Sequence, residues 1–85
     1  MISELPSWRF EGDRLKAEFV LADFDTAMKV VNAVADVARE LDHHPLMTNV
    51  YNRLMFSLCT HGVGDKVTEL DVELARRIST VMVSV

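Results

Sequence analysis

Residues 15–41 read LKAEFVLADFDTAMKVVNAVADVAREL, and the period of the apolar residues changes within this stretch. Up to Leu21 every second residue is apolar, which is typical of a strand with one buried face. From Phe24 onward the apolar spacing is three or four, which predicts an amphipathic helix. Asp23 lies at the change and is the expected N-cap, because its carboxylate can accept an amide of the first turn. The expected apolar stripe of the helix is Phe24, Ala27, Met28, Val31, Val34, Ala35, Ala38 and Leu41.

Hairpins are expected on both sides of this helix. Trp8 and Phe10 alternate with polar residues, and turn residues follow at positions 11–14. This pattern predicts a first hairpin with one buried face. Residues 46–60 alternate in the same way and predict a second hairpin, which bends near Asn52.

Both helices have recognisable ends. Pro45 stops the first helix near Leu41, because proline lacks an amide proton and forces the preceding residue toward extended geometry. A last helix is expected after Thr68, which forms a capping-box pattern with Asp71. The element order β-β-α-β-β-α predicts an α+β fold, with a four-stranded antiparallel sheet and two helices packed on one face. Residues 1–85 are expected to form a single domain.

Composition argues against several classes of function. Thirteen acidic and nine basic residues give a net charge of −4, and Lys and Arg form no cluster, so nucleic-acid binding is not expected. No apolar run approaches the roughly 20 residues that cross a bilayer, which predicts a soluble protein without a membrane partner. The single Cys59 and the lack of a signal-peptide pattern in residues 1–6 favour a cytoplasmic location.

Three histidines are the candidate functional residues. His43 and His44 follow the first helix, and His61 lies eighteen positions beyond His43. If the second hairpin bends about Asn52, the numbers of opposed residues sum to about 104, so positions 43 and 61 face each other. Imidazole exchanges protons near neutral pH, and such a cluster is therefore suited to general acid–base chemistry.

The same residues also fit structural roles and a metal site. His43 and His44 can instead stabilise the C-terminal end of the helix, where imidazolium meets free carbonyl groups and the helix dipole. A zinc site made by the three histidines is a third alternative, although neither a Cys pair nor an HExxH motif supports it. Asp71 fits equally well as the reciprocal partner of Thr68 in the capping box.

A longer pattern contains these histidines. His43-His44-Pro45 is followed at fixed separations by Tyr51, His61 and Asp71. In these residues the chain resembles the pterin-4a-carbinolamine dehydratases. Members of that family remove water from 4a-hydroxytetrahydropterins without a metal, and the resemblance implies no cofactor.

The resemblance also implies a role for each matching residue. It implies that His43 and His61 transfer protons, that His44 helps to hold the pterin, and that the backbone around two further residues contacts it. Asp71 would support the site electrostatically. The implied site residues are His43, His44, His61 and Asp71 for catalysis, and Asp42 and Thr60 for pterin binding.

The chain departs from the family pattern at several positions. Arg39 stands where the family has an acid or another polar residue, and Leu46 and Met47 replace an acid and a Trp that are common in active members. The loop at residues 64–68, Gly-Asp-Lys-Val-Thr, is longer than usual by about one residue. Trp8 lies so near the start that the usual N-terminal helix of the family is expected to be lacking.

Two functions follow from the resemblance. The longer loop and the missing helix favour a short branch of the family that is associated with α-carboxysomes and assists RuBisCO assembly. The first expectation is therefore a protein-binding assembly factor or chaperone for RuBisCO, located in the cytoplasm or with the carboxysome. The alternative is an active 4a-hydroxytetrahydrobiopterin dehydratase, a lyase. In either case the exposed edges of a small sheet predict a homodimer.

Overall fold

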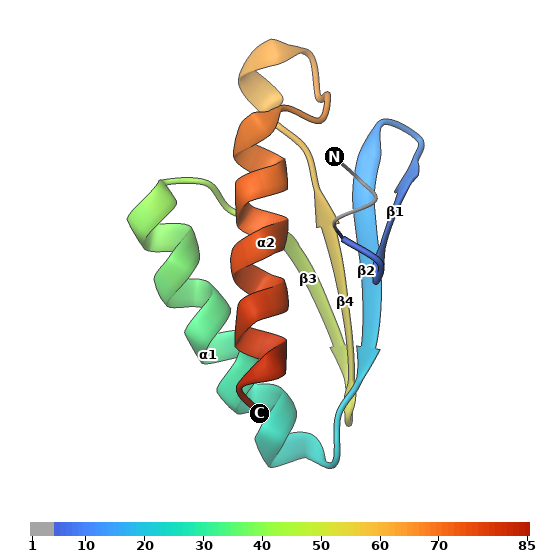
Figure 1. The fold of residues 1–85 in the computed structure, drawn as a ribbon, viewed down its shortest axis with the longest axis vertical. Coiled ribbons are helices and arrows are strands. Elements are labelled where there is room, and N and C mark those ends of the chain that lie inside the picture. Colours follow the sequence, from blue (N-terminus) through green and yellow to red (C-terminus); the bar gives the residue numbers. More distant parts are fainter. Residues whose placement is uncertain (1–4) are drawn as a thin grey trace.

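The computed structural model describes residues 5–85, in which helices lie on one face of a four-stranded antiparallel sheet (Figure 1). Residues 1–4 lie outside the described residues, and they are part of the segment 1–6 that lacks a signal-peptide pattern. The strands are β1 (Trp8–Glu11), β2 (Arg14–Val20), β3 (Leu46–Val50) and β4 (Arg53–Leu58), in the spatial order β1-β2-β4-β3. The predicted α+β fold and its element order are confirmed.

Each hairpin is closed by a two-residue turn. In the first turn, Gly12 and Asp13 have φ angles of 59° and 58°. In the second, Tyr51 has a φ angle of 53° and is followed by Asn52. Positive φ in such short turns matches the twist of the strands that they join. The side chain of Asn49 donates to the carbonyl of Tyr51 at 3.1 Å and thereby stabilises the second turn.

Local signals place the ends of both helices. α1 (Phe24–Leu41) is capped by Asp23, whose Oδ1 accepts the amide of Thr26 at 2.8 Å, as predicted. Asp42 follows with a left-handed φ of 51° and ends the helix. α2 (Glu69–Val83) begins with the predicted capping box. Within residues 5–85, neither helix has the combination of length and apolar character that a membrane span needs.

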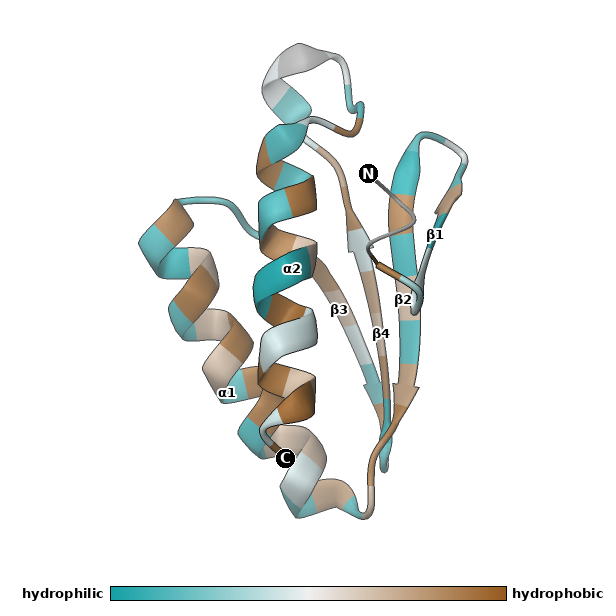
Figure 2. Ribbon diagram, in the orientation of Figure 1, coloured by the Kyte–Doolittle hydropathy of each residue, from teal (hydrophilic) through white to brown (hydrophobic). Residues whose placement is uncertain are grey.

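The buried face of α1 differs from the predicted stripe. Val30 and Val37 are buried although the prediction omitted them, whereas Phe24 is exposed. Apolar residues alternate with polar ones along both helices (Figure 2), and α1 has enough of them to form more than one stripe. Packing against α2 and the sheet selects one of these stripes. The core consists of Leu5, Trp8, Leu15, Ala17, Leu21, Ala27, Val30, Val34, Val37, Leu54, Phe56, Leu58, Val72, Leu74, Ala75 and Ile78.

Trp8 joins the edge strand β1 to the core. Its ring lies 6.3 Å from Phe19 and 6.2 Å from Phe56 between centroids, and its Nε1 donates to Oγ of Ser79 at 3.0 Å. A buried Trp needs such a partner for its N–H. Phe10 was predicted to be buried with Trp8, but 54% of it is exposed. An edge strand is covered less completely than a central one, so part of its apolar side remains at the surface.

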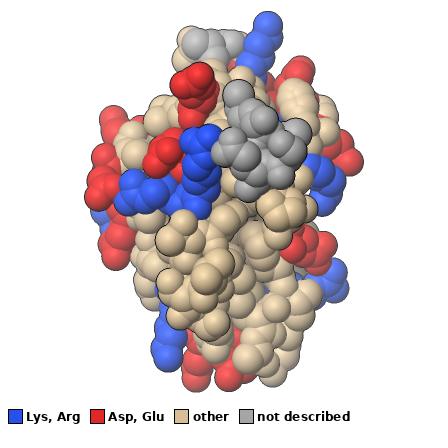
Figure 3. Space-filling view, viewed as in Figure 1, with Lys and Arg blue, Asp and Glu red and all other residues tan. Residues whose placement is uncertain are grey.

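Charged side chains connect the two helices at the surface. Arg77 of α2 forms an ion pair with Glu40 near the end of α1. Acidic and basic side chains are intermixed on the upper part of this face, whereas uncharged residues fill its lower centre and charged ones lie along the lower edge (Figure 3). Mixed charges of this kind are typical of a solvated helix surface.

Candidate active site

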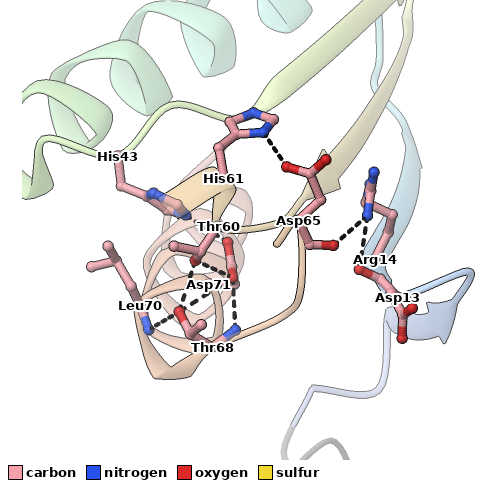
Figure 4. A network of polar contacts seen from close by, with 9 residues as sticks. All are labelled: Asp13, Arg14, His43, Thr60, His61, Asp65, Thr68, Leu70 and Asp71. Atoms are coloured by element: carbon pink, nitrogen blue, oxygen red, sulfur yellow. Dashed lines mark hydrogen bonds and ion pairs between the residues drawn. The ribbon is translucent and has the colours of Figure 1, made fainter. Parts of the chain in front are cut away.

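The buried carboxylate of Asp71 is the centre of a hydrogen-bond network (Figure 4). Its Oδ1 lies 2.5 Å from Nε2 of His43. Its Oδ2 accepts the hydroxyl of Thr60 at 2.8 Å and the backbone amide of Thr68 at 2.8 Å. These contacts provide the hydrogen bonds that a buried carboxylate requires. Asp71 therefore completes the predicted capping box and also contacts His43, one of the predicted site histidines.

Helix ends explain why His43 and Asp71 meet. His43 comes directly after the left-handed residue that ends α1, and its backbone amide donates to the carbonyl of Ala38 at 3.0 Å. Asp71 lies in the first turn of α2, where the helix dipole favours a negative charge. The contact thus links the C-terminal end of one helix to the N-terminal end of the other, and it holds the His43 ring with 9% of the residue exposed.

The register of the second hairpin differs from the prediction by one residue. Opposed residues in β3 and β4, such as Leu46 and Ser57, have numbers that sum to 103, not 104. Continued past the strand ends, this register places Thr60, rather than His61, opposite His43. Successive residues of an extended chain point to opposite faces, and in this register Thr60 is directed toward Asp71, the carboxylate that His43 also contacts. The predicted register, in which positions 43 and 61 face each other, is therefore wrong by one residue.

His61 instead lies on the same side as His44. Both line a pocket of about 300 Å³ at the end of the sheet. Nδ1 of His61 lies 2.6 Å from Oδ1 of Asp65, and 83% of the His61 side chain is exposed. The pocket is lined by Arg14, His44, Leu46, Ser57, Cys59 and His61.

The structure thus divides the predicted catalytic residues into two groups. His43 and Asp71 form a buried pair on the helix side, whereas His44 and His61 line an open pocket. His43 belongs to the first group and the adjacent His44 to the second, so the two groups are joined through the backbone. Imidazole can exchange protons with a bound ligand, and His44 and His61 are the histidines that a ligand in this pocket would meet.

The backbone amides of the predicted pterin-binding residues already donate hydrogen bonds within the chain. The amide of Asp42 donates to the carbonyl of Arg39 at 3.2 Å, and the amide of Thr60 donates to the carbonyl of Lys66 at 2.8 Å. The hydroxyl of Thr60 is directed to Asp71. A ligand at these residues would therefore meet backbone carbonyl oxygens, which accept hydrogen bonds.

Several contributors to the site were not predicted from the sequence. Arg14 and Cys59 line the pocket, and Asp65 contacts His61. Arg14 comes from the first hairpin, and its Nη1 donates to the backbone carbonyl of Asp65 at 2.8 Å. A sequence signal existed only for Asp65, which follows Gly64 in a loop next to the last histidine.

Arg39 does not face the site as its position suggested. Its Nη1 lies 2.7 Å from Oδ1 of Asp36 in an exposed i, i+3 pair on α1. Its positive charge is therefore partly balanced by Asp36 and by solvent. The reversal of charge at this position has a smaller consequence for the histidines than the sequence pattern alone indicated.

The zinc alternative based on three histidines does not fit the structure, because His43 is turned toward Asp71. Among the described residues, side chains with metal-ligand spacing are Cys59, His61 and Asp65, whose ligand atoms all lie within 4.8 Å of one another. This group shares Cys59 and His61 with the pocket.

Comparisons with known proteins point to one family. Residues 1–81 match a family model described as pterin 4 alpha carbinolamine dehydratase. A Metallosphaera sedula protein assigned by name to the pterin-4-alpha-carbinolamine dehydratases is 46% identical over 74 residues, which cover 87% of this chain and 76% of that protein. One from Thermomicrobium roseum is 42% identical over 79 residues, covering 93% and 84%.

Two solved structures share the fold. A transcriptional coactivator/pterin dehydratase from Brucella melitensis superposes with a TM-score of 0.90 at 34% identity, covering 94% of this chain and 86% of that one. A pterin dehydratase-like protein described as a RuBisCO assembly factor in the α-carboxysome has a TM-score of 0.75 at 20% identity, covering 88% of each chain. The second likeness shows the fold alone.

Proposed function

Because the chain belongs to the pterin-4a-carbinolamine dehydratase family, we propose that it dehydrates a 4a-hydroxytetrahydropterin. The observation that carries this proposal is the pocket at the end of the sheet, which two histidines of the family motif line together. Its volume of about 300 Å³ lies at the lower end of the range for small-molecule sites. A bicyclic pterin is a ligand of suitable size.

The reaction requires one proton to be removed and one to be added. The C4a–O bond breaks, the hydroxyl leaves as water after protonation, and loss of the N5 proton forms the C4a=N5 double bond. A neutral imidazole can accept the N5 proton, and an imidazolium can protonate the leaving hydroxyl. Two histidines near the pterin are therefore sufficient for the proton transfers.

We assign one of these transfers to His61, which lines the pocket, and the other to His43, which directly precedes the pocket residue His44 in the chain. His61 lies in the pocket, and Asp65 orients its ring through Nδ1, so Nε2 faces a ligand. Asp71 holds His43 through Nε2, which makes Nδ1 the ring atom that can exchange a proton. A carboxylate that orients a histidine in this way is a recurring feature of acid–base sites. In this assignment His44 contacts the pterin from the pocket wall.

The polar groups around the pocket fit the edge of a pterin. The amino group and ring N–H groups of a pterin are donors and need acceptors. The amides of Asp42 and Thr60 are engaged within the chain, so the carbonyl oxygens of this backbone are the groups we expect to meet them.

A stopped-flow assay of 4a-hydroxytetrahydropterin dehydration tests the proposal. The wild-type chain should accelerate water loss, and His61→Ala should reduce kcat by about 10²–10⁴-fold, the usual contribution of a general acid or base. His43→Ala should reduce kcat similarly, whereas His44→Ala should mainly raise KM. A large kcat loss in His44→Ala with little change in His43→Ala would reassign the second proton transfer to His44. A wild-type chain without turnover would exclude the dehydratase.

Assembly of RuBisCO is a second candidate function, favoured by the longer loop at residues 64–68 and by the exposed apolar edge of the sheet. Leu46, Val50 and Tyr51 on or beside β3 are 65%, 61% and 64% exposed. A client protein could cover this edge by adding a strand. The support is weaker than for the dehydratase, because the assembly factor shares only 20% identity with this chain.

Co-expression with α-carboxysomal RuBisCO subunits tests the second candidate. An assembly factor should raise the yield of assembled RuBisCO, and Val50→Lys should abolish this effect while leaving dehydration unchanged. If the yield of assembled RuBisCO does not rise while dehydration is normal, the assembly role is excluded and dehydration remains. A location with the carboxysome is proposed only together with the assembly role.

A further inference from the structure

We propose that Cys59, His61 and Asp65 form a binding site for a zinc-like divalent metal ion. Their ligand atoms, a thiol sulfur, an imidazole nitrogen and a carboxylate oxygen, all lie within 4.8 Å of one another. Tetrahedral zinc with Zn–S of about 2.3 Å and Zn–N or Zn–O of about 2.0–2.1 Å separates its ligands by about 3.3–3.7 Å. Small side-chain rotations are therefore enough to bring the three atoms around one ion.

The backbone holds these residues close together before any metal binds. Cys59 and His61 are two positions apart on an extended chain, with Thr60 at φ −108° and ψ 112°, so their side chains lie on one side. Gly64 and Asp65 have left-handed φ angles of 80° and 58°, which turn the chain back. An isolated β-bridge between Thr60 and Lys66 closes the loop. Three ligands within seven residues thus need little ordering when they bind.

Arg14 further stabilises the loop from outside the ligand set. Its guanidinium donates to the backbone carbonyl of Asp65 at 2.8 Å, which leaves the carboxylate of that residue available. Its positive charge is unfavourable for a cation, but a thiolate and a carboxylate together supply two negative charges that a divalent ion neutralises. The net electrostatic balance therefore favours binding.

An ion pair alone does not account for the arrangement. The contact between His61 and Asp65 is exposed, and exposed pairs of this kind contribute about 0–1 kcal/mol. It also does not explain why the half-buried thiol of Cys59 lies at the same place. A soft sulfur, an imidazole and a carboxylate are ligand types that zinc commonly combines, and three protein ligands leave a fourth position open.

Metal binding has a consequence for the pocket, and this part rests on the proposed dehydratase function. A metal ion would occupy a lone pair of His61 and prevent that imidazole from accepting a proton. Zinc would then inhibit dehydration. The site would act as a metal-sensitive control on the same histidine.

Cobalt(II) titration of the reduced full chain tests the site without reference to activity. One equivalent of cobalt should produce thiolate charge-transfer absorption in the near ultraviolet and intense visible bands of tetrahedral cobalt, and zinc should remove both. Cys59→Ser should abolish the charge-transfer band. Asp65→Asn and His61→Ala should each weaken binding at least about tenfold, since even outer partners of metal ligands contribute 10–100-fold. Asp13→Asn removes the same charge outside the cluster and should leave binding unchanged.

Two results would overturn the proposal. Absence of the bands would exclude the site, and bands that survive both Asp65→Asn and His61→Ala would show a thiol that binds metal alone. If the wild-type chain has dehydratase activity, the ratio of its rates with and without zinc should fall well below one and return toward one in Cys59→Ser. If the wild-type chain has no such activity, the proposed function fails while the cobalt spectra still decide the metal site.

Discussion

Nε2 of His43 lies 2.5 Å from Oδ1 of Asp71, a carboxylate without solvent exposure at the start of α2. The two residues are 28 positions apart and connect the ends of both helices. Such a contact serves the fold and the site together. It orients the imidazole, and it also satisfies a buried acid whose other oxygen is held by Thr60 and Thr68.

The His43–Asp71 pair should contribute strongly to stability. Asp71→Asn and His43→Ala should each lower the free energy of unfolding by roughly 3–5 kcal/mol, because either change leaves a buried partner uncompensated. The double variant should lose less than the sum, and urea denaturation measures all three. Additive losses would contradict coupling between the residues. Asp36→Asn, which removes an exposed pair with Arg39, is the matched control and should cost less than about 1 kcal/mol.

His61 should matter for chemistry but hardly for folding. Its side chain is 83% exposed, so His61→Ala should change the free energy of unfolding by no more than about 0.5 kcal/mol. The same variant should lose dehydration. Urea denaturation and the stopped-flow assay on one preparation separate the two effects. A large loss of stability would mean that the loop at residues 59–66 depends on the His61–Asp65 contact.

Asp23 should make stability depend on pH in the acid range. Hydrogen bonds from Thr26 hold the pKa of the Asp23 carboxyl below its usual value. A depressed folded-state pKa stabilises the fold above the unfolded-state pKa, and this stabilisation is lost as the pH falls through the folded-state pKa. Asp23→Asn keeps a capping oxygen but does not titrate. The stability difference between wild type and variant should therefore shrink as the pH falls below about 4. Parallel curves from urea denaturation across this range would refute the assignment.

When no client protein occupies it, the exposed edge of β3 is expected to join two copies of the chain into a homodimer. Val50 is 61% exposed on this strand, and an edge strand offers unpaired backbone groups to a second copy. Size-exclusion chromatography with light scattering should give about twice the chain mass of 9.6 kDa at micromolar concentration. Val50→Lys should produce monomer, because a charged side chain disfavours strand addition. Val83→Lys, on the exposed surface of α2, should remain dimeric; a monomeric wild type would contradict the expectation.

Local signals predicted the elements and their ends well. Asp23, Pro45 and the pair Thr68 and Asp71 act within one turn of the helix ends that they mark, so their effects can be read from neighbouring residues. The same is true of the alternation in β2 and β4. By contrast, Val30 and Val37 were missed because several stripes on α1 were apolar enough to be buried.

The sequence by itself determined the order of strands and helices, the helix caps and the histidines that make up the candidate site, because each depends on residues close together in the chain. Only the tertiary structure decided which of these residues meet. A turn of two residues, Tyr51 and Asn52, sets the register to an odd sum, whereas a turn centred on one residue would set an even one. In this register Thr60 is directed toward Asp71, which His43 also contacts, while His61 lines the pocket, since side chains alternate between the faces of an extended chain.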